Sequence, residues 1–276
     1  AQQYWRVILA FAIFTVLVAW LLVERTPHKG KVAFFTIFIY PLLAYGLFYG
    51  GLFGLPVVET HKWGGLMLTL ILAAVGMFCS LPFGVILALG RRSSMPVAKS
   101  VCIVFIEFWR GVPLITVLFM SSVIFPLFLP EGVTVNKILR AQAAIILFTA
   151  AYIAEVVRGG LQAIPSGQYE AADSLGLNYF QTMRLIILPQ ALKIVIPPSV
   201  SILISAFKDT SLVIIIALYD LLKTTQTTLS DPTWMAFSTE AYLFAAAIYF
   251  PFCFFMSRYS RYLEIYLGWT TEREKK

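Results

Sequence analysis

Long apolar runs alternate with short polar segments along this chain of 276 residues. A helix needs about 20 predominantly apolar residues to cross the roughly 30 Å hydrocarbon core of a bilayer, and seven runs reach or approach that length. The pattern therefore predicts an all-α integral membrane protein. The candidate spans lie at about residues 5–23, 32–54, 65–89, 97–129, 141–157, 194–218 and 241–257.

The fourth apolar run is too long for one straight span. A continuous helix over residues 97–129 would be roughly 50 Å long, well above the thickness of the hydrocarbon core. We therefore expect Pro113 to bend this segment, or its first half to lie near the cytoplasmic face.

The composition agrees with a membrane protein. Hydrophobic residues make up 59% of the chain and charged residues 13%, and the mean hydropathy is +0.83. A soluble core of this length does not need so much apolar sequence. The net charge of +7 does not indicate a nucleic-acid-binding protein, because the charges lie between the spans and form no basic stripe with stacking aromatic residues.

The distribution of Lys and Arg predicts the orientation. With Arg110 and Lys208 set aside as intramembrane, 14 basic residues fall on one side of the seven-span arrangement and 5 on the other. The positive-inside rule places the larger group in the cytoplasm. Residues 159–189 are then cytoplasmic, and the amino-terminal residue lies outside.

The amino-terminal segment does not resemble a cleaved signal. Residues 1–23 contain no small-residue cleavage site, so we interpret them as a membrane span. Because the chain starts outside and without Met, we expect the native start to be missing from it.

A polar segment, residues 159–189, separates the fifth and sixth apolar runs. Helical turns are predicted from Gln168 to Leu175, and Gly176 follows where a helix-ending residue adopts the left-handed conformation that glycine tolerates. Asn178 is a predicted N-cap, and Gln181 completes a capping-box pattern three residues later. The segment therefore predicts a helix–turn–helix.

The second short helix of this segment is expected from about Tyr179 to Ile187, with Pro189 at the start of the next element. Leu175, Tyr179 and Phe180 give the turn a larger apolar surface than a solvated loop needs. A partner that covers this surface would explain it. The alternative is an interfacial hairpin that lies on lipid headgroups, which explains the polarity of the segment but not its residue spacing.

The spacing in this segment carries a family resemblance. The sequence EAADSLGLNYFQTMRLIILP fits the pattern EAA-x3-G-x9-I-x-L-P at Glu170, Ala171, Ala172, Gly176, Ile186, Leu188 and Pro189. It resembles the signature of the inner-membrane subunits of bacterial ATP-binding-cassette (ABC) importers. The resemblance implies that residues 159–189 form a coupling loop that docks on a cytoplasmic ATPase, with Tyr179 on the contacting surface.

Charged residues inside the predicted spans are costly in hydrocarbon and usually line a cavity or form pairs. Glu107 and Arg110 are three residues apart, as are Glu155 and Arg158, and helical geometry places each pair on one helix face. Both pairs are candidates for a substrate pathway. Ion pairing that only joins helices is an equally good interpretation of these residues.

A third polar group interrupts the sixth run. Lys208 and Asp209 are adjacent and are followed by the hydroxyls of Thr210 and Ser211. Neighbouring opposite charges cannot share one helix face, and a local break in the helix would free backbone groups to meet a polar ligand. We therefore favour a place in the substrate pathway for these four residues. A zwitterionic amino acid suits such a site, since its carboxylate needs a cation and its ammonium needs acceptors.

The segments around these charges resemble the polar-amino-acid branch of the importers, most of all the M-type permease of the general L-amino-acid Aap/Bzt class. The resemblance implies a type I importer domain at residues 59–276, a five-helix core, with two accessory spans at 1–58. It also implies a multi-pass protein of the bacterial inner membrane. The implied partners are a second permease subunit in a heterodimer, two ATPases that hold ATP and Mg, and a periplasmic amino-acid-binding protein.

A secondary transporter and a membrane-embedded enzyme are the two other functional classes compatible with an apolar chain of this kind. An ion-coupled secondary amino-acid transporter would also bury Glu107, Glu155 and Asp209, but it has no use for a polar EAA loop. A membrane-embedded enzyme would need a convergent catalytic or metal cluster, and the scattered cysteines and histidines provide none. The P-loop pattern is absent, so we expect no ATP hydrolysis by this chain and no cofactor bound to it.

Overall fold

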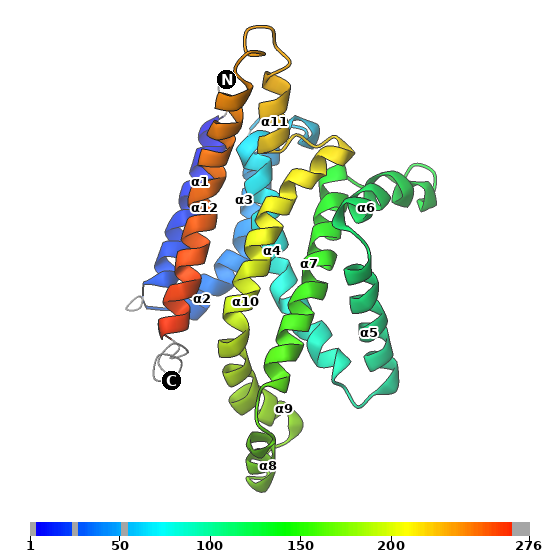
Figure 1. Ribbon diagram of the computed structural model, residues 1–276, viewed down its shortest axis with the longest axis vertical. Coiled ribbons are helices and arrows are strands. Elements are labelled where there is room, and N and C mark those ends of the chain that lie inside the picture. Colours follow the sequence, from blue (N-terminus) through cyan, green and yellow to red (C-terminus); the bar gives the residue numbers. More distant parts are fainter. Residues whose placement is uncertain (1–3, 24–26, 51–54, 267–276) are drawn as a thin grey trace. The chain divides into compact units, whose positions relative to one another are not determined.

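A computed structural model describes residues 4–23, 27–50 and 55–266 of the chain (Figure 1). Within these ranges the regular elements are all helical, apart from one isolated backbone bridge between Gly65 and Asp220. The chain divides into two compact units after Trp63, five residues beyond the boundary expected from the sequence. Each unit is described by itself.

The first unit contains α1 (Tyr4–Leu22) and a second helical segment. That segment runs through α2 (Lys29–Phe34), one π-helical stretch, η1 (Phe35–Ile39), and α3 (Tyr40–Tyr49). The hydroxyl of Tyr40 donates to the carbonyl of Ala10 at 2.6 Å and ties the two segments together. Both spans predicted here are thus helical, although residues 51–54 of the second lie outside the described residues.

The second unit contains the remaining predicted spans. Its first half consists of α4 (Gly65–Arg91), α5 (Pro96–Gly111), α6 (Leu114–Phe119), η3 (Met120–Ile124), η4 (Phe125–Phe128) and α7 (Lys137–Gln162). Its second half consists of α8 (Ser166–Ser174), α9 (Tyr179–Thr182), η5 (Met183–Ile187), α10 (Leu188–Asp209), η6 (Thr210–Ile216), α11 (Leu221–Thr228) and α12 (Ser238–Tyr266). In length and composition, α4, α7, the stretch Tyr179–Ile216 and α12 can each cross a membrane. The short α11 is not anticipated by the sequence pattern.

The long fourth run is bent, as its length requires. Its two helical parts, Pro96–Gly111 and Leu114–Phe128, meet at 103°. The bend lies at Val112 and Pro113, both of which have extended backbone conformations. Proline restricts the residue before it to such conformations, so the position of the bend follows from the sequence. The expectation for Pro113 is confirmed.

Close packing around α7 forms the core of the second unit. Gly84 on α4 faces Ile153, where an added Cβ would lie only 2.6 Å from the Ile153 Cγ2 atom. Gly160 faces α10, where a Cβ would overlap the side chain of Val195. Small residues at such crossings allow helix backbones to approach closely in lipid. Glycines therefore set the spacing of α7 from α4 and from α10.

A buried polar cluster joins elements at the end of the second unit opposite α8 and α9 (Figure 1). Asp220 is fully buried and caps α11, accepting from the amides of Leu222 at 3.2 Å and Lys223 at 2.9 Å. The hydroxyl of Tyr249 on α12 donates to Asp220 Oδ2 at 3.3 Å. The amide of Leu221 donates to Thr69 Oγ1 on α4 at 3.0 Å, so α4, α11 and α12 are held together here.

Replacing Asp220 tests this polar cluster. Burial raises the pKa of the Asp220 carboxyl, so Asp220→Asn should be tolerated, since asparagine caps equally well and removes a buried charge. Asp220→Ala leaves two amide donors without a cap and should cost about 1–2 kcal/mol, lowering the melting temperature in detergent. Glu131→Ala, at an exposed turn position, is the control. Equal melting of Asp220→Ala and wild type would rule out the capping role.

Candidate coupling and substrate sites

The polar segment forms the helix–turn–helix that its sequence predicts. Gly176 follows α8 with φ of +71°, and its amide donates to Asp173 O at 2.9 Å. The amide of Leu177 reaches back to Ala172 O at 3.2 Å, which closes the end of the helix in the manner typical of a left-handed glycine. The predicted left-handed conformation of Gly176 is therefore confirmed.

The second helix starts with the predicted capping box. Asn178 Oδ1 accepts from the Gln181 amide at 3.0 Å, and Gln181 Oε1 accepts from the Asn178 amide at 3.0 Å. The helix continues as α9 and then as the π-helical η5, and α10 begins at Leu188 with Pro189 in its first turn. Every boundary in this segment agrees with the prediction to within two residues.

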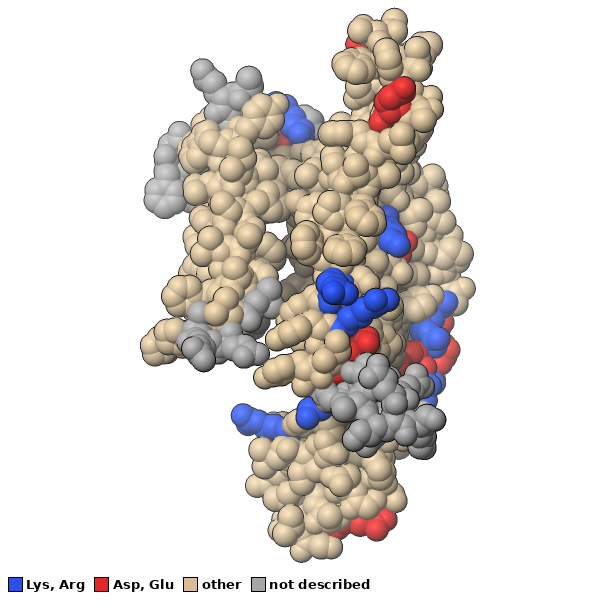
Figure 2. Space-filling view, turned by 60° about the vertical axis from the view of Figure 1, so that its left-hand side comes forward, with Lys and Arg blue, Asp and Glu red and all other residues tan. Residues whose placement is uncertain are grey.

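The hairpin has an apolar tip that the rest of the described chain does not cover. Leu175, Tyr179 and Phe180 are 74%, 67% and 68% exposed, and Leu185 is 63% exposed. In the space-filling view the hairpin is the lowest part of the second unit and is largely uncharged, with acidic groups at its lower edge (Figure 2). An apolar tip that projects from a polar helix pair is typical of a protein-binding surface.

The inner side of the hairpin packs against the helices that carry it. Ala172 is fully buried, whereas Glu170 and Ala171 face outward. Met183 and Ile187 are 6% and 0% exposed and belong to the same apolar cluster as residues of α7 and α10. The side-chain amide of Gln190 also donates from Nε2 to Gln168 Oε1 at 2.9 Å, which ties the start of α10 to α8. The hairpin is thus attached firmly to the spans on both sides of it.

A cluster of charges joins α4, α5 and α7. Arg91 Nη1 contacts Glu107 Oε1 at 2.9 Å and Glu155 Oε1 at 2.7 Å. Arg158 forms a bidentate pair with Glu155, with the closest contact at 2.9 Å, and Arg110 Nη1 lies 3.6 Å from Glu155 Oε2. Three guanidinium groups and two carboxylates give the cluster a net charge of +1.

These contacts correct one expectation and confirm another. The pair Glu155–Arg158 forms as its spacing predicts. Glu107 instead pairs with Arg91 of α4. Arg110 contacts Glu155, and its Cζ atom lies 5.6 Å from the centroid of the Tyr152 ring. Contacts between separate helices therefore take precedence over the local pairing of Glu107 with Arg110. Arg91 is not among the predicted site residues, because a basic residue at the cytoplasmic end of an apolar run is indistinguishable from a loop charge in the sequence, although here it is the last residue of α4.

The polar group at the end of α10 is less disrupted than expected. The helix does not unwind at Lys208–Ser211 but tightens from α to 3₁₀ geometry at Thr210. Thr210 is fully buried, and its hydroxyl donates to Phe207 O at 2.7 Å. Lys208 is exposed, and Asp209 and Ser211 are partly buried. Among the described residues, no hydrogen bond or ion pair joins this group to the Arg91 cluster.

Comparison with known proteins identifies the family. Residues 80–265 match the family described as the binding-protein-dependent transport system inner membrane component. The chain belongs to this family. It is therefore a multi-pass component of an inner membrane transport system, with the helical fold expected for a type I importer domain.

Relatives and solved structures of this inner membrane component agree. It is 58% identical over 263 residues, 95% of this chain and 72% of the other, to an inner membrane amino-acid ABC transporter permease, YhdY, of Escherichia coli K12. It is 53% identical over 211 residues to the glutamate/glutamine/aspartate/asparagine permease BztC of Rhodobacter capsulatus, covering 76% of this chain but only 49% of that protein. A crystal structure of an amino acid ABC transporter with histidines matches at a TM-score of 0.64 and 32% identity, over 72% of this chain and 91% of that one.

Replacing Arg91 tests whether the charge cluster holds the helices together. Arg91→Gln leaves Glu107 without its ion pair and removes a contact to Glu155, so the protein should melt at a lower temperature than wild type. Arg91→Lys should be intermediate, because one ammonium reproduces the bridging geometry poorly. Lys99→Gln on α5 is the control, as Lys99 is exposed. If Arg91→Gln and Lys99→Gln have the same melting temperature, the cluster does not stabilise the fold.

Proposed function

We propose that this chain is the membrane permease of an ATP-driven importer, and that it passes L-amino acids from the periplasm to the cytoplasm by alternating access. The observation that carries the proposal is the apolar tip of the α8–α9 hairpin, which combines the EAA spacing with a surface left uncovered by the described chain. The names of the relatives support amino acids as the substrate class, and that of BztC supports polar ones.

The proposed assembly has several partners. Two cytoplasmic ATPases hold ATP and Mg, and one of them docks on this chain through Glu170, Ala171, Ala172, Gly176, Tyr179, Leu188 and Pro189. A periplasmic protein delivers the amino acid, in keeping with the family's dependence on a binding protein. A second, related permease completes a heterodimeric core. Residues 59–276 supply the transport domain of this chain, and residues 1–58 supply accessory spans.

The structure supports a mechanical route from the ATPase to the spans. Movement of the docked hairpin passes into α7 and α10 through Met183 and Ile187, which are buried against them, and through the Gln168–Gln190 contact. Such packed elements move as rigid bodies and not by gradual deformation. Displacement of α7 then shifts Glu155 and the arginines around it, which changes access to the pathway.

We place the substrate pathway along two groups of polar residues. One is Glu107, Arg110, Glu155 and Arg158, where Glu107 and Arg110 keep 54% and 35% of their side chains exposed and can meet a ligand. The other is Lys208, Asp209, Thr210 and Ser211 at the far end of α10. A zwitterion that passes between them finds a carboxylate and a cation in each group. An ion-coupled secondary transporter is disfavoured, since the family works with a binding protein.

Substitution of Gly176 tests the coupling role. A Cβ at Gly176 would meet no atom within 4 Å, so the effect of Gly176→Val comes from forcing a β-branched residue to φ of +71°. It should uncouple the complex and lower both amino-acid uptake and substrate-stimulated ATP hydrolysis about tenfold or more, as expected for a strain of 1–3 kcal/mol at the hairpin. Gly176→Asn is the matched control, because asparagine tolerates this conformation.

The assay uses proteoliposomes that contain the whole complex. Wild-type uptake should require ATP and should persist when an ionophore collapses the proton gradient. Glu170→Ala should be milder than Gly176→Val, since it leaves the hairpin shape intact. If the Gly176→Val complex keeps its ATPases and transports normally, the hairpin is not the coupling element. ATP-independent uptake that the ionophore abolishes would favour a secondary transporter.

A further inference from the structure

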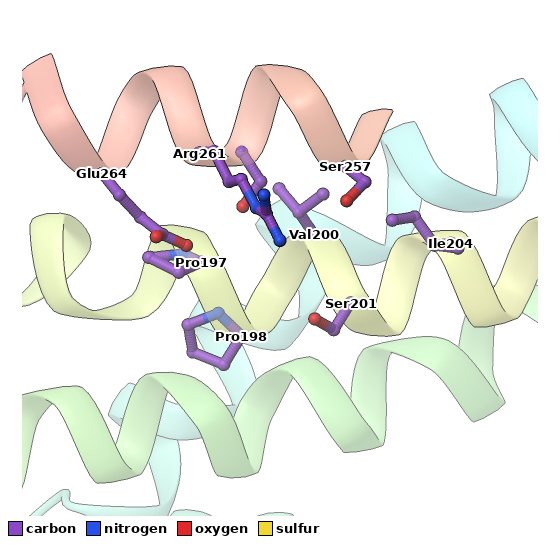
Figure 3. Close-up of a pocket in the computed structure, with 9 residues that line it drawn as sticks. Pro197, Pro198, Val200, Ser201, Ile204, Ser257, Arg261 and Glu264 are labelled. Atoms are coloured by element: carbon purple, nitrogen blue, oxygen red, sulfur yellow. The ribbon is translucent and has the colours of Figure 1, made fainter. Parts of the chain in front are cut away.

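A pocket of about 290 Å³ lies between α10 and α12, away from the residues already described (Figure 3). Its volume is close to the lower end of the range for small-molecule sites, roughly 300–1,000 Å³. Its lining is unusually polar for a helix pair in a membrane protein. The polar lining consists of Ser201 on α10 and of Ser257, Ser260, Arg261 and Glu264 on α12.

The charged groups of this pocket are available to a ligand. Arg261 and Glu264 are three residues apart on α12, where opposite charges usually pair. In the part of the chain that the structure describes, neither forms an ion pair or a hydrogen bond, either with the other or elsewhere. Instead both side chains extend from α12 toward α10, with the Glu264 carboxylate beside Pro197 and the Arg261 guanidinium beside Val200 (Figure 3).

Two prolines of α10 form part of the opposite wall. Pro197 and Pro198 both line the pocket within a helix that continues without interruption. Because proline has no N–H, the carbonyls of Lys193 and Ile194, four residues earlier, lose their helical donors. A helical carbonyl points toward the residue four positions on, so the two proline rings stand over these oxygens, and neither Lys193 nor Ile194 lines the pocket.

The pocket also lies where the coupling movement would reach it. Pro197 is nine residues beyond the start of α10, roughly 14 Å along the helix from the end that carries the hairpin. The other wall belongs to α12, which packs mainly on α10 and α11. A displacement of α10 relative to α12 would therefore change the width of the pocket.

We propose that this pocket binds the transported amino acid on the cytoplasmic half of its path. The guanidinium of Arg261 binds the α-carboxylate, and the carboxylate of Glu264 binds the α-ammonium. The hydroxyls of Ser201 and Ser257 supply further hydrogen bonds. Both charges belong to the part common to all amino acids, so the site recognises the backbone and not one side chain. This inference rests on the proposed amino-acid import.

The test measures binding of radiolabelled L-glutamine to the whole complex in nanodiscs of phosphatidylglycerol, which contain no zwitterionic headgroup. Loss of one charge-assisted contact should weaken binding about tenfold or more in Arg261→Gln and in Glu264→Gln. Arg258→Gln, on the same helix but outside the pocket, is the control and should bind like wild type. L-Glutamine α-amide, which has no α-carboxylate, should compete poorly with radiolabelled L-glutamine for binding to the wild-type complex. The Arg261→Gln complex should lose this preference for a ligand with a free α-carboxylate. A merely structural role of Arg261 would not change that preference.

The outcomes separate this inference from the function on which it depends. If the wild-type complex imports amino acids and Arg261→Gln binds and imports them equally well, the pocket is not on the path and the importer function stands. If wild type imports no amino acid, both proposals fail. If phosphatidylethanolamine co-purifies with wild type but not with Arg261→Gln, while L-glutamine uptake is equal, the pocket is a lipid headgroup site and the inference is overturned.

Discussion

Close packing of α7 against its neighbours is the constraint on which the rest of the second unit depends. Glycines at the two crossings, Gly84 toward Ile153 and Gly160 toward Val195, bring α4 and α10 against opposite parts of the same helix. In lipid, no hydrophobic effect drives one helix onto another, so contact at this distance has to supply the association energy. A bulkier residue at either crossing would separate the helices and break the contacts on both sides.

This packing gives two further features their place. Glu155 pairs with Arg158 of its own helix, and it can also gather Arg91 and Arg110 only because α7 lies within reach of the ends of α4 and α5. The hairpin continues directly from α7 and returns as α10, and Ile187 is buried between them. A force on the hairpin therefore acts on the two helices that determine where the charges lie. The hairpin and the charge cluster are therefore joined through the packing of α7.

Local sequence rules account for much of this structure. Five span-length helices of the described residues follow from the lengths of the apolar runs, and a sixth span is the bent pair at Pro113, whose bend follows from proline stereochemistry. The turn at Gly176 and the capping box at Asn178 follow from the conformations these residues favour. Each of these features depends on residues within a few positions of one another, which is why the sequence is sufficient to predict them.

Contacts between distant residues could not be predicted in the same way. Arg91 and Glu155 are 64 positions apart, and charge counting alone assigns Arg91 to a loop. The 3₁₀ geometry at Thr210 depends on its burial, which no local pattern reveals. The pocket between α10 and α12 likewise requires the packing of two helices some 60 residues apart in sequence.

Binding of the apolar hairpin tip to an ATPase can be detected by site-specific photo-crosslinking. A benzoylphenylalanine replaces Phe180, 68% exposed on the hairpin, or Phe128, 80% exposed in η4. The two positions are matched in residue type and exposure. Phe180 belongs to α9, and Phe128 to the helical stretch that follows α6, and these elements lie toward opposite ends of the second unit (Figure 1). After irradiation of whole cells, the account predicts a crosslink from Phe180 to an ATPase subunit and none from Phe128. A Phe180 probe that captures only lipid, in cells whose transport is intact, would contradict it.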